Sequence, residues 1–175
     1  MVKHILVATD GSDGAGKAVE MAAQAAKHFG AKLTVLHVLL HGSRAEEASR
    51  LAEAEHLVRH VSTAAMPHVA DAPATMVDLF RLAQSNEETA RIISALGDRI
   101  AEDAAIRARE LGASDVSIQV QPGDYAEVIL DVAKKIGADM IVIGSRGLGE
   151  LKGLLVGSVS NKVAEHAKCS VLTVR

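Results

Sequence analysis

Short runs of branched apolar residues recur along the chain, and longer stretches with helical periodicity separate them. The four strongest runs cover residues 5–8, 33–38, 140–143 and 171–174, and a weaker run covers 116–120. Apolar runs of this length and composition predict β-strands. Strands that alternate with helices predict a parallel sheet with helices on both faces. We therefore expect a doubly wound α/β fold on a five-stranded parallel sheet.

The stretches between the runs carry the start and stop signals of helices. A glycine follows three of the helical patterns, at Gly30, Gly112 and Gly137, and glycine is the preferred residue after a helix end. A longer helix is expected to begin at residues 85–88, which form a capping-box pattern, and another at Asp124. The run at 116–120 alternates between apolar and polar residues, so we expect that strand at an edge of the sheet.

The length of 175 residues suits a single domain that spans residues 1–175. Residues 40–86 are longer than a simple crossover needs. Their periodicity predicts one helix within 44–61 and a shorter one within 76–83, with prolines at Pro67 and Pro73 between them. We expect residues 40–86 to be a helical insertion that packs on the domain or on a protein partner.

Charge and composition exclude several classes of partner. The net charge is −3, and the chain has two Phe, one Tyr and no Trp. Such a chain lacks the basic footprint for duplex DNA or an anionic membrane and the aromatic platforms for single strands. No apolar window is long enough for a membrane span, the first run is too short for a signal peptide, and Cys169 has no second cysteine to pair with. These features favour the cytoplasm.

The strongest signal for chemistry in the chain is a glycine- and serine-rich pattern that follows the apolar run at 140–143. It reads Gly144-Ser145-Arg146-Gly147, then nine residues, then Gly157-Ser158-Val159-Ser160, where the last helix begins. Glycines let a backbone approach phosphates closely, and helix N-termini supply N–H donors and partial positive charge. Arg146 or Lys152 can neutralise phosphate charge, and the hydroxyls of Ser158 and Ser160 can donate to it. The alternative is that these residues only shape a loop and cap a helix.

Asp10-Gly11-Ser12 follows the first strand and forms the second candidate segment. Ligands of open α/β sheets bind beyond the carboxyl ends of the strands, where the strand order reverses, so Asp10 and Gly144 are expected to face each other. Asp10 can accept hydrogen bonds from ribose hydroxyls or help to hold a phosphate-bound Mg²⁺. The alternative is that Asp10, Ser12 or Asp13 caps the first helix, which we prefer for Ser12 and Asp13.

Other motifs are incomplete. The stretch from Gly11 to Lys17 resembles a P-loop, but Ala18 stands where that motif needs a hydroxyl. The second strand ends without an acidic residue for a dinucleotide ribose, which leaves an oxidoreductase as a weak alternative. His56 and His60 lack the glutamate of a zinc protease, because Leu57 occupies its place.

Asp10-Gly11-Ser12, Leu36-His37-Val38 and the pattern from Gly144 to Ser160 together resemble the universal stress protein family. The glycine pattern is that family's ATP-binding signature. The resemblance implies a Rossmann-like sheet, similar to the adenine nucleotide alpha hydrolases, in the order 3-2-1-4-5. It implies homodimerisation through the strand at 171–174. The nucleotide-binding residues that it implies are Ala8, Thr9, Asp10, Val38, Ile143, Gly144, Arg146, Gly147, Gly157, Ser158, Val159 and Ser160.

The resemblance also implies how the ligand lies, with adenine against the Val38 backbone and the Ala8-Thr9 turn. Ribose is expected near Asp10, and the phosphates on Gly147, Gly157, Ser158 and Ser160. Our first hypothesis is a stress-response or signalling module whose binding state depends on ATP, with AMP, ADP or cyclic AMP left open. The alternatives are a slow ATPase or phosphotransferase that uses Mg²⁺-ATP at Asp10, and a stress protein without a ligand.

Overall fold

The computed structural model describes residues 1–39, 87–147 and 157–175. The predicted helical insertion at 40–86 lies outside the described residues. So does Lys152, one of the two basic residues considered for phosphate binding. The single-domain assignment over residues 1–175 therefore remains an expectation.

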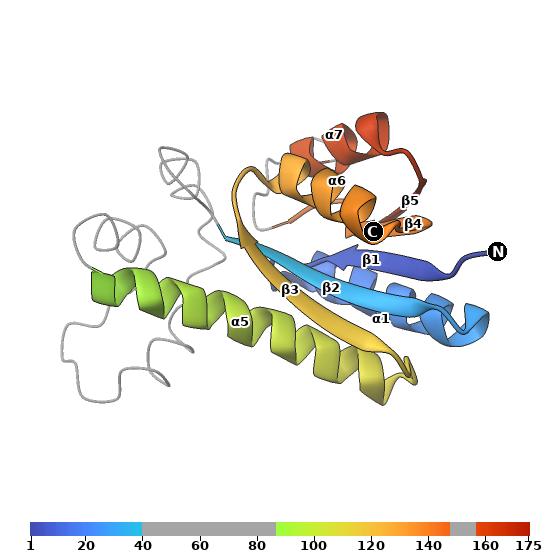
Figure 1. Cartoon of the computed structure of the whole chain (residues 1–175), viewed down its shortest axis with the longest axis horizontal. Coiled ribbons are helices and arrows are strands. Elements are labelled where there is room, and N and C mark those ends of the chain that lie inside the picture. The colour runs from blue at the N-terminus through green and yellow to red at the C-terminus, as the bar shows by residue number, and fades with distance from the viewer. Residues whose placement is uncertain (40–86, 148–156) are drawn as a thin grey trace.

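Five parallel strands form one sheet in the order β3-β2-β1-β4-β5, as the resemblance implied (Figure 1). Each strand begins or ends within two residues of its predicted bounds. The strands are β1 (His4–Ala8), β2 (Lys32–Leu39), β3 (Val116–Pro122), β4 (Met140–Gly144) and β5 (Ser170–Val174). The alternating strand β3 lies at one edge, as expected, and β5 lies at the other.

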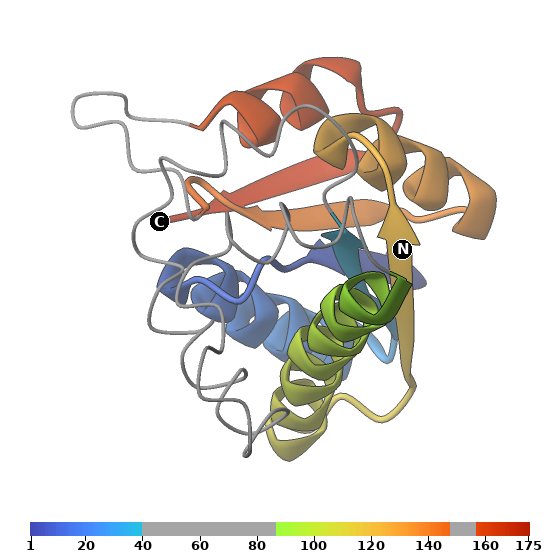
Figure 2. The same ribbon diagram turned by 90° about the vertical axis from the view of Figure 1, so that its left-hand side faces the viewer.

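The interior strands are apolar because helices cover both of their faces. Four described helices do this: α1 (Asp13–Phe29), α5 (Glu87–Glu110), α6 (Tyr125–Ile136) and α7 (Ser158–His166). Helices α1 and α5 lie on one face, and α6 and α7 lie on the other (Figure 2). Two separate apolar cores result, one on each side of the sheet.

Helix ends follow the capping signals in the sequence. The hydroxyl of Ser12 accepts a hydrogen bond from the backbone N–H of Ala15, and the carboxylate of Asp124 accepts one from that of Glu127. Gly30 and Gly137 end α1 and α6 with φ angles of 62° and 64°, in the left-handed region that glycine tolerates best. The predicted cap by Ser12 and the predicted stops at both glycines are confirmed.

The strand register brings three carboxyl ends to the same edge of the sheet. Ala8, near the end of β1, pairs with Leu36 of β2 on one side and Ile143 of β4 on the other. β1 leads to α1 on one face of the sheet, whereas β3 and β4 lead to α6 and α7 on the other. The order of the strands therefore reverses at β1 and β4, where a ligand site is expected.

None of the helices in the described ranges is long and apolar enough to cross a membrane. Cys169 precedes β5 and is half-buried. Burial raises the pKa of its thiol, which keeps the group protonated and weakly nucleophilic at neutral pH.

Candidate functional site

Asp10, after β1, lies directly against Gly147, after β4. A methyl group built on Gly147 would overlap Oδ2 of the Asp10 carboxylate, so no larger residue fits there without displacing Asp10. The two residues are 137 positions apart in the sequence, and the pairing of β1 with β4 brings them together. The predicted ribose-binding and phosphate-binding segments therefore meet at one point.

The Asp10 carboxylate is oriented by the segment that follows it. Its Oδ1 accepts the backbone N–H of Ser12 at 3.0 Å and the Ser12 hydroxyl at 2.6 Å. Ser12 in turn caps α1, so the carboxylate is fixed relative to that helix. The second oxygen, Oδ2, lies against Gly147. Asp10 thus borders the glycine loop, and the cap of α1 is Ser12.

The loop after β4 packs closely on the first turn of α1. A methyl group on Gly14 would lie 2.9 Å from the carbonyl oxygen of Arg146, and one on Gly144 would lie at the same distance from that oxygen. Such contacts are too short for ordinary carbon and oxygen atoms. Glycine at both positions therefore permits the loop to lie against the helix.

Ser145 joins three elements beneath the loop. Its N–H donates to the carbonyl of Val174 in β5 at 2.6 Å, and its carbonyl accepts the N–H of Gly157 at 2.7 Å. The Ser160 hydroxyl donates to the same Ser145 carbonyl at 3.0 Å. Ser145 is buried. The two halves of the glycine-serine pattern are thus held together through the backbone of one residue.

Helix α7 presents its N-terminus at this place. Its N-cap is Gly157, which contributes no side-chain hydrogen bond to the first turn. Ser158 is exposed at the first helical position, whereas Ser160 is buried. The Ser160 hydroxyl also lies within hydrogen-bond distance of the Gly157 carbonyl at 3.0 Å. The predicted hydroxyl donors therefore differ: Ser158 faces solvent, and Ser160 points into the protein and supports the turn.

The apolar residues of the predicted site belong to the core beneath α6 and α7. Ala8, Val38 and Ile143 are buried members of that core. Thr9 continues from β1 and donates its N–H to the Leu36 carbonyl at 2.9 Å, which ties the turn after β1 to β2. The ends of three strands thus contribute apolar residues to the same core.

His37 was not predicted to be part of this arrangement. It is buried in β2, and its Nδ1 donates a hydrogen bond of 2.9 Å to the Thr9 carbonyl. Burial lowers the pKa of His37, although the hydrogen bond and the charges of Asp10 and Asp98 act in the opposite direction. A neutral imidazole therefore supports the Ala8-Thr9 turn. The signal in the sequence was a titratable residue within the largely apolar run at 33–38.

Tyr125 is a second residue that sequence reasoning missed. It begins α6, is half-buried, and packs against the core that contains Ala8, Val38 and Ile143. Burial and the negative charge of Asp10 both raise the pKa of its phenol, which keeps the hydroxyl protonated at neutral pH. As the only tyrosine of the chain, directly after the turn that follows β3, it could have been singled out.

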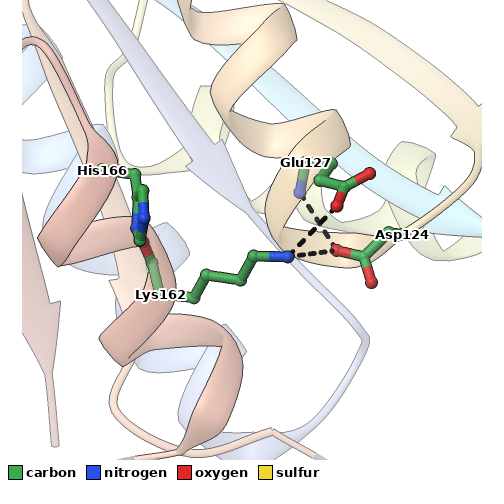
Figure 3. A network of polar contacts seen from close by, with 4 residues as sticks. All are labelled: Asp124, Glu127, Lys162 and His166. Atoms are coloured by element: carbon green, nitrogen blue, oxygen red, sulfur yellow. Dashed lines mark hydrogen bonds and ion pairs between the residues drawn. The ribbon is translucent and has the colours of Figure 1, made fainter.

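Polar contacts fix the start of α6 against α7, as Figure 3 shows. The Lys162 ammonium of α7 lies 3.5 Å from Asp124 Oδ1 and 3.3 Å from Glu127 Oε1. The Lys162 carbonyl accepts a hydrogen bond of 2.9 Å from His166 Nδ1. The residue that caps α6 is thereby joined to the helix whose N-terminus borders the glycine loop.

The predicted residues come from four segments that meet at the carboxyl edge of β1, β2 and β4. These segments are residues 8–10, residue 38, residues 143–147 and residues 157–160. Arg146 lies in the loop, and its backbone carbonyl forms the contact with α1. Among the residues that the structure describes, no group of three or more His, Cys, Asp or Glu forms a metal cage.

Comparisons with known proteins find similarity along the whole length of the chain. The model of the Universal stress protein family matches residues 1–175. Universal stress protein YxiE of Bacillus subtilis is 34% identical over 175 residues and is covered, like this chain, over its full length. Stress response protein NhaX of the same organism is 30% identical, with 98% of this chain and 97% of the relative covered.

Solved structures share the fold. Universal stress protein UspA from Lactobacillus plantarum has a TM-score of 0.68 at 23% identity, with 99% of this chain and 98% of the other covered. A universal stress protein in complex with cAMP has a TM-score of 0.60 at 24% identity, covering 99% and 97%. The universal stress protein from Archaeoglobus fulgidus in complex with dAMP has a TM-score of 0.59 at 20% identity, covering 100% and 98%.

Proposed function

Because the chain belongs to the universal stress protein family, we propose that it binds an adenine nucleotide at the carboxyl edge of its sheet. The bound nucleotide, ATP in our proposal, acts as a signal in the stress response by changing how the protein contacts its partners. The observation that carries this proposal is the close approach of Asp10 to Gly147. It supports the proposal because a carboxylate that can accept hydrogen bonds from ribose hydroxyls then lies beside a backbone loop that can lie against phosphates.

The site offers a different chemical surface to each part of the ligand. The base lies against the Val38 backbone and the Ala8-Thr9 turn, next to Ile143, and the ribose hydroxyls donate to Asp10. The phosphates lie on Gly144, Gly147 and the first turn of α7, where Gly157, Ser158, Val159 and Ser160 supply backbone N–H groups and Ser158 a hydroxyl. Arg146 offsets their charge. Mg²⁺ binds through the phosphates, with Asp10 as its protein partner.

Two structural neighbours support an adenine nucleotide as the ligand class. One is a universal stress protein in complex with cAMP, and another is one in complex with dAMP. Both ligands join adenine to a phosphorylated sugar. AMP, ADP and cyclic AMP share this chemistry with ATP, so a competition series among these nucleotides identifies the preferred ligand.

The first experiment is to denature protein that was purified without added nucleotide and to identify any released compound by mass spectrometry. Calorimetry with added ATP then gives the affinity of the emptied protein. We expect near one adenine nucleotide per chain. The double variant Asp10→Ala and Gly157→Ala should lose binding while its circular dichroism spectrum stays unchanged. An emptied wild-type chain without measurable affinity for any adenine nucleotide would refute the proposal.

Phosphate release in the same preparation separates a binding module from a slow ATPase or phosphotransferase. Asp10 beside the loop is the group that would hold Mg²⁺-ATP in an enzyme. Release that exceeds one phosphate per chain and disappears in Asp10→Asn would favour the enzyme. Occupancy without turnover would favour the binding module.

We further propose that the chain is a cytoplasmic homodimer through residues 171–174. Strand β5 is an edge of the sheet, and Leu172 is 36% exposed on it. Unpaired edges with exposed apolar residues favour association with a second copy. Residues 40–86 are proposed to present the nucleotide state to a protein partner, whereas the net charge argues against nucleic acid and membrane surfaces.

A further inference from the structure

Tyr125 stands at the point where the β3–α6 turn reaches the end of β2. The N–H of Gly123, in that turn, donates to the Leu39 carbonyl at 3.2 Å. Asp124 then caps α6, and Lys162 of α7 contacts Asp124 (Figure 3). Tyr125 is therefore held at the first position of a helix whose start is attached to β2 on one side and to α7 on the other.

The surroundings of Tyr125 are those of the base half of the proposed site. It is half-buried and packs against the apolar core that contains Ala8, Val38 and Ile143. The negative charge of Asp10 also acts on its phenol and raises the pKa of that group. The ring therefore packs on the core that contributes the apolar residues expected near the base, and it lies within electrostatic range of the acceptor expected for the ribose.

We propose that the ring of Tyr125 contacts the adenine base and determines how tightly the base, as distinct from the phosphates, is held. This inference rests on the function proposed above. An aromatic ring offers a large flat surface to a base, and such contacts carry a substantial part of base-binding affinity. The hydroxyl remains a neutral donor because burial and Asp10 oppose its ionisation.

The chain provides its own spectroscopic probe for this contact. Tyr125 is the only tyrosine, and the chain has no tryptophan, so tyrosine emission arises from this residue alone. Excitation at the red edge of tyrosine absorption, beyond the adenine band, avoids absorption by the ligand. We expect ATP to change the emission of wild-type protein with a midpoint that matches the dissociation constant from calorimetry.

Three variants separate the contact from general packing. Tyr125→Ala removes the ring, Tyr125→Phe keeps it, and Leu130→Ala shortens a half-buried residue of the same helix that packs on the same core. We expect Tyr125→Ala to weaken the binding of ATP and the binding of AMP by the same factor, about tenfold. Tyr125→Phe should stay within about threefold of wild type, since the ring carries the contact. Leu130→Ala should bind like wild type, and thermal unfolding verifies that each variant is folded.

Each combination of results supports or overturns the proposed contact between Tyr125 and the base. Equal losses for ATP and AMP in Tyr125→Ala, with saturable emission changes in wild type, support the contact with the base. Calorimetric binding by wild type without an emission change, together with normal affinity in Tyr125→Ala, overturns this inference and leaves the proposed function intact. A loss of affinity for ATP but not for AMP in Tyr125→Ala also overturns the inference, and so does an equal loss of affinity in Leu130→Ala. A wild-type chain that binds no adenine nucleotide overturns both proposals.

Discussion

The imidazole Nδ1 of His37 lies 2.9 Å from the carbonyl oxygen of Thr9, and the ring is buried between the sheet and α5. This contact joins the end of β2 to the turn that leads from β1 to Asp10. Since a carbonyl only accepts, Nδ1 carries the proton of the neutral ring. The turn on which the proposed base site depends is therefore supported from the opposite face of the sheet.

Burial lowers the pKa of His37 below its ordinary value of 6.5. The unfolded chain thus takes up a proton first as the pH falls, and the free energy of unfolding decreases below about pH 6.5 until the folded-state pKa is reached. His37→Asn keeps a donor for Thr9 without titrating. Relative to this variant, the free energy of unfolding of the wild type should decrease by up to about 1.4 kcal/mol per pH unit in that window. Urea unfolding of both proteins from pH 8 to pH 5 measures this difference. Parallel plots of unfolding free energy against pH would contradict the lowered pKa of His37.

A methyl group at position 147 should damage the site, because it overlaps the Asp10 carboxylate. We expect Gly147→Ala to weaken ATP binding about tenfold or more and to cost about 1–3 kcal/mol of stability. Gly16→Ala is the matched control, since a methyl group there meets nothing within 4 Å. It lies inside α1 and should raise stability by up to about 1 kcal/mol. Calorimetry and chemical unfolding of both variants test this. Equal affinities in the two would be inconsistent with the close approach.

Ser158 and Ser160 should respond in opposite ways to truncation. Ser158 is exposed at the first position of α7, so Ser158→Ala should lower ATP affinity by about tenfold, the usual effect of losing a hydrogen bond to a charged group, with little change in stability. Ser160 donates inward to Ser145 or Gly157, so Ser160→Ala should cost about 1 kcal/mol of stability. Paired calorimetry and thermal unfolding distinguish them. A reversed pattern would mean that Ser160 turns outward to the phosphate.

The cap of α6 should influence ligand binding through Tyr125. Asp124→Ala removes the acceptor for the Glu127 N–H and should cost about 1 kcal/mol of stability. Asp124→Ser keeps an acceptor but not the charge near Lys162, and should recover most of that loss. If the first turn of α6 positions the base contact, ATP affinity falls in the alanine variant and recovers in the serine variant. Unchanged affinity in both would separate the cap from the site.

Edge strand β5 provides a test of association. Leu172→Lys places a charge on an exposed apolar position, and charged edge residues oppose pairing between sheets. We expect sedimentation analysis to show a shift from dimer to monomer with ATP affinity largely retained. Leu172→Val serves as the control that keeps an apolar, strand-compatible side chain. A wild-type chain that sediments as a monomer would refute the proposed dimer.

Much of the fold was accessible from the sequence because its signals are local. Apolar runs identify the strands, Gly30 and Gly137 end their helices, and Ser12 caps α1 by a contact three residues away. The strand order came from the resemblance to a family, because periodicity alone does not say which strands are neighbours. The structure confirms that order and the edge position of β3.

The side-chain contacts within the site were less accessible. The apposition of Asp10 and Gly147 depends on a strand pair that spans most of the chain. The inward rotation of Ser160 depends on a carbonyl fifteen residues away. Tyr125 carries no motif, and its importance follows only from the packing of α6 on the core beneath Ala8 and Val38. Such contacts arise from tertiary packing, which local patterns do not encode.

The pairing of β1 with β4 also determines when binding competence arises during folding. The Asp139 carboxylate, one residue before β4, accepts the backbone N–H of Lys3, 136 residues away. Contacts between residues so far apart in the sequence carry a loop-closure cost that local contacts do not, and such contacts slow folding. Asp10 and Gly147 meet only when β1 and β4 are paired. A nucleotide bound between them would therefore slow the unfolding of the finished protein without accelerating its folding.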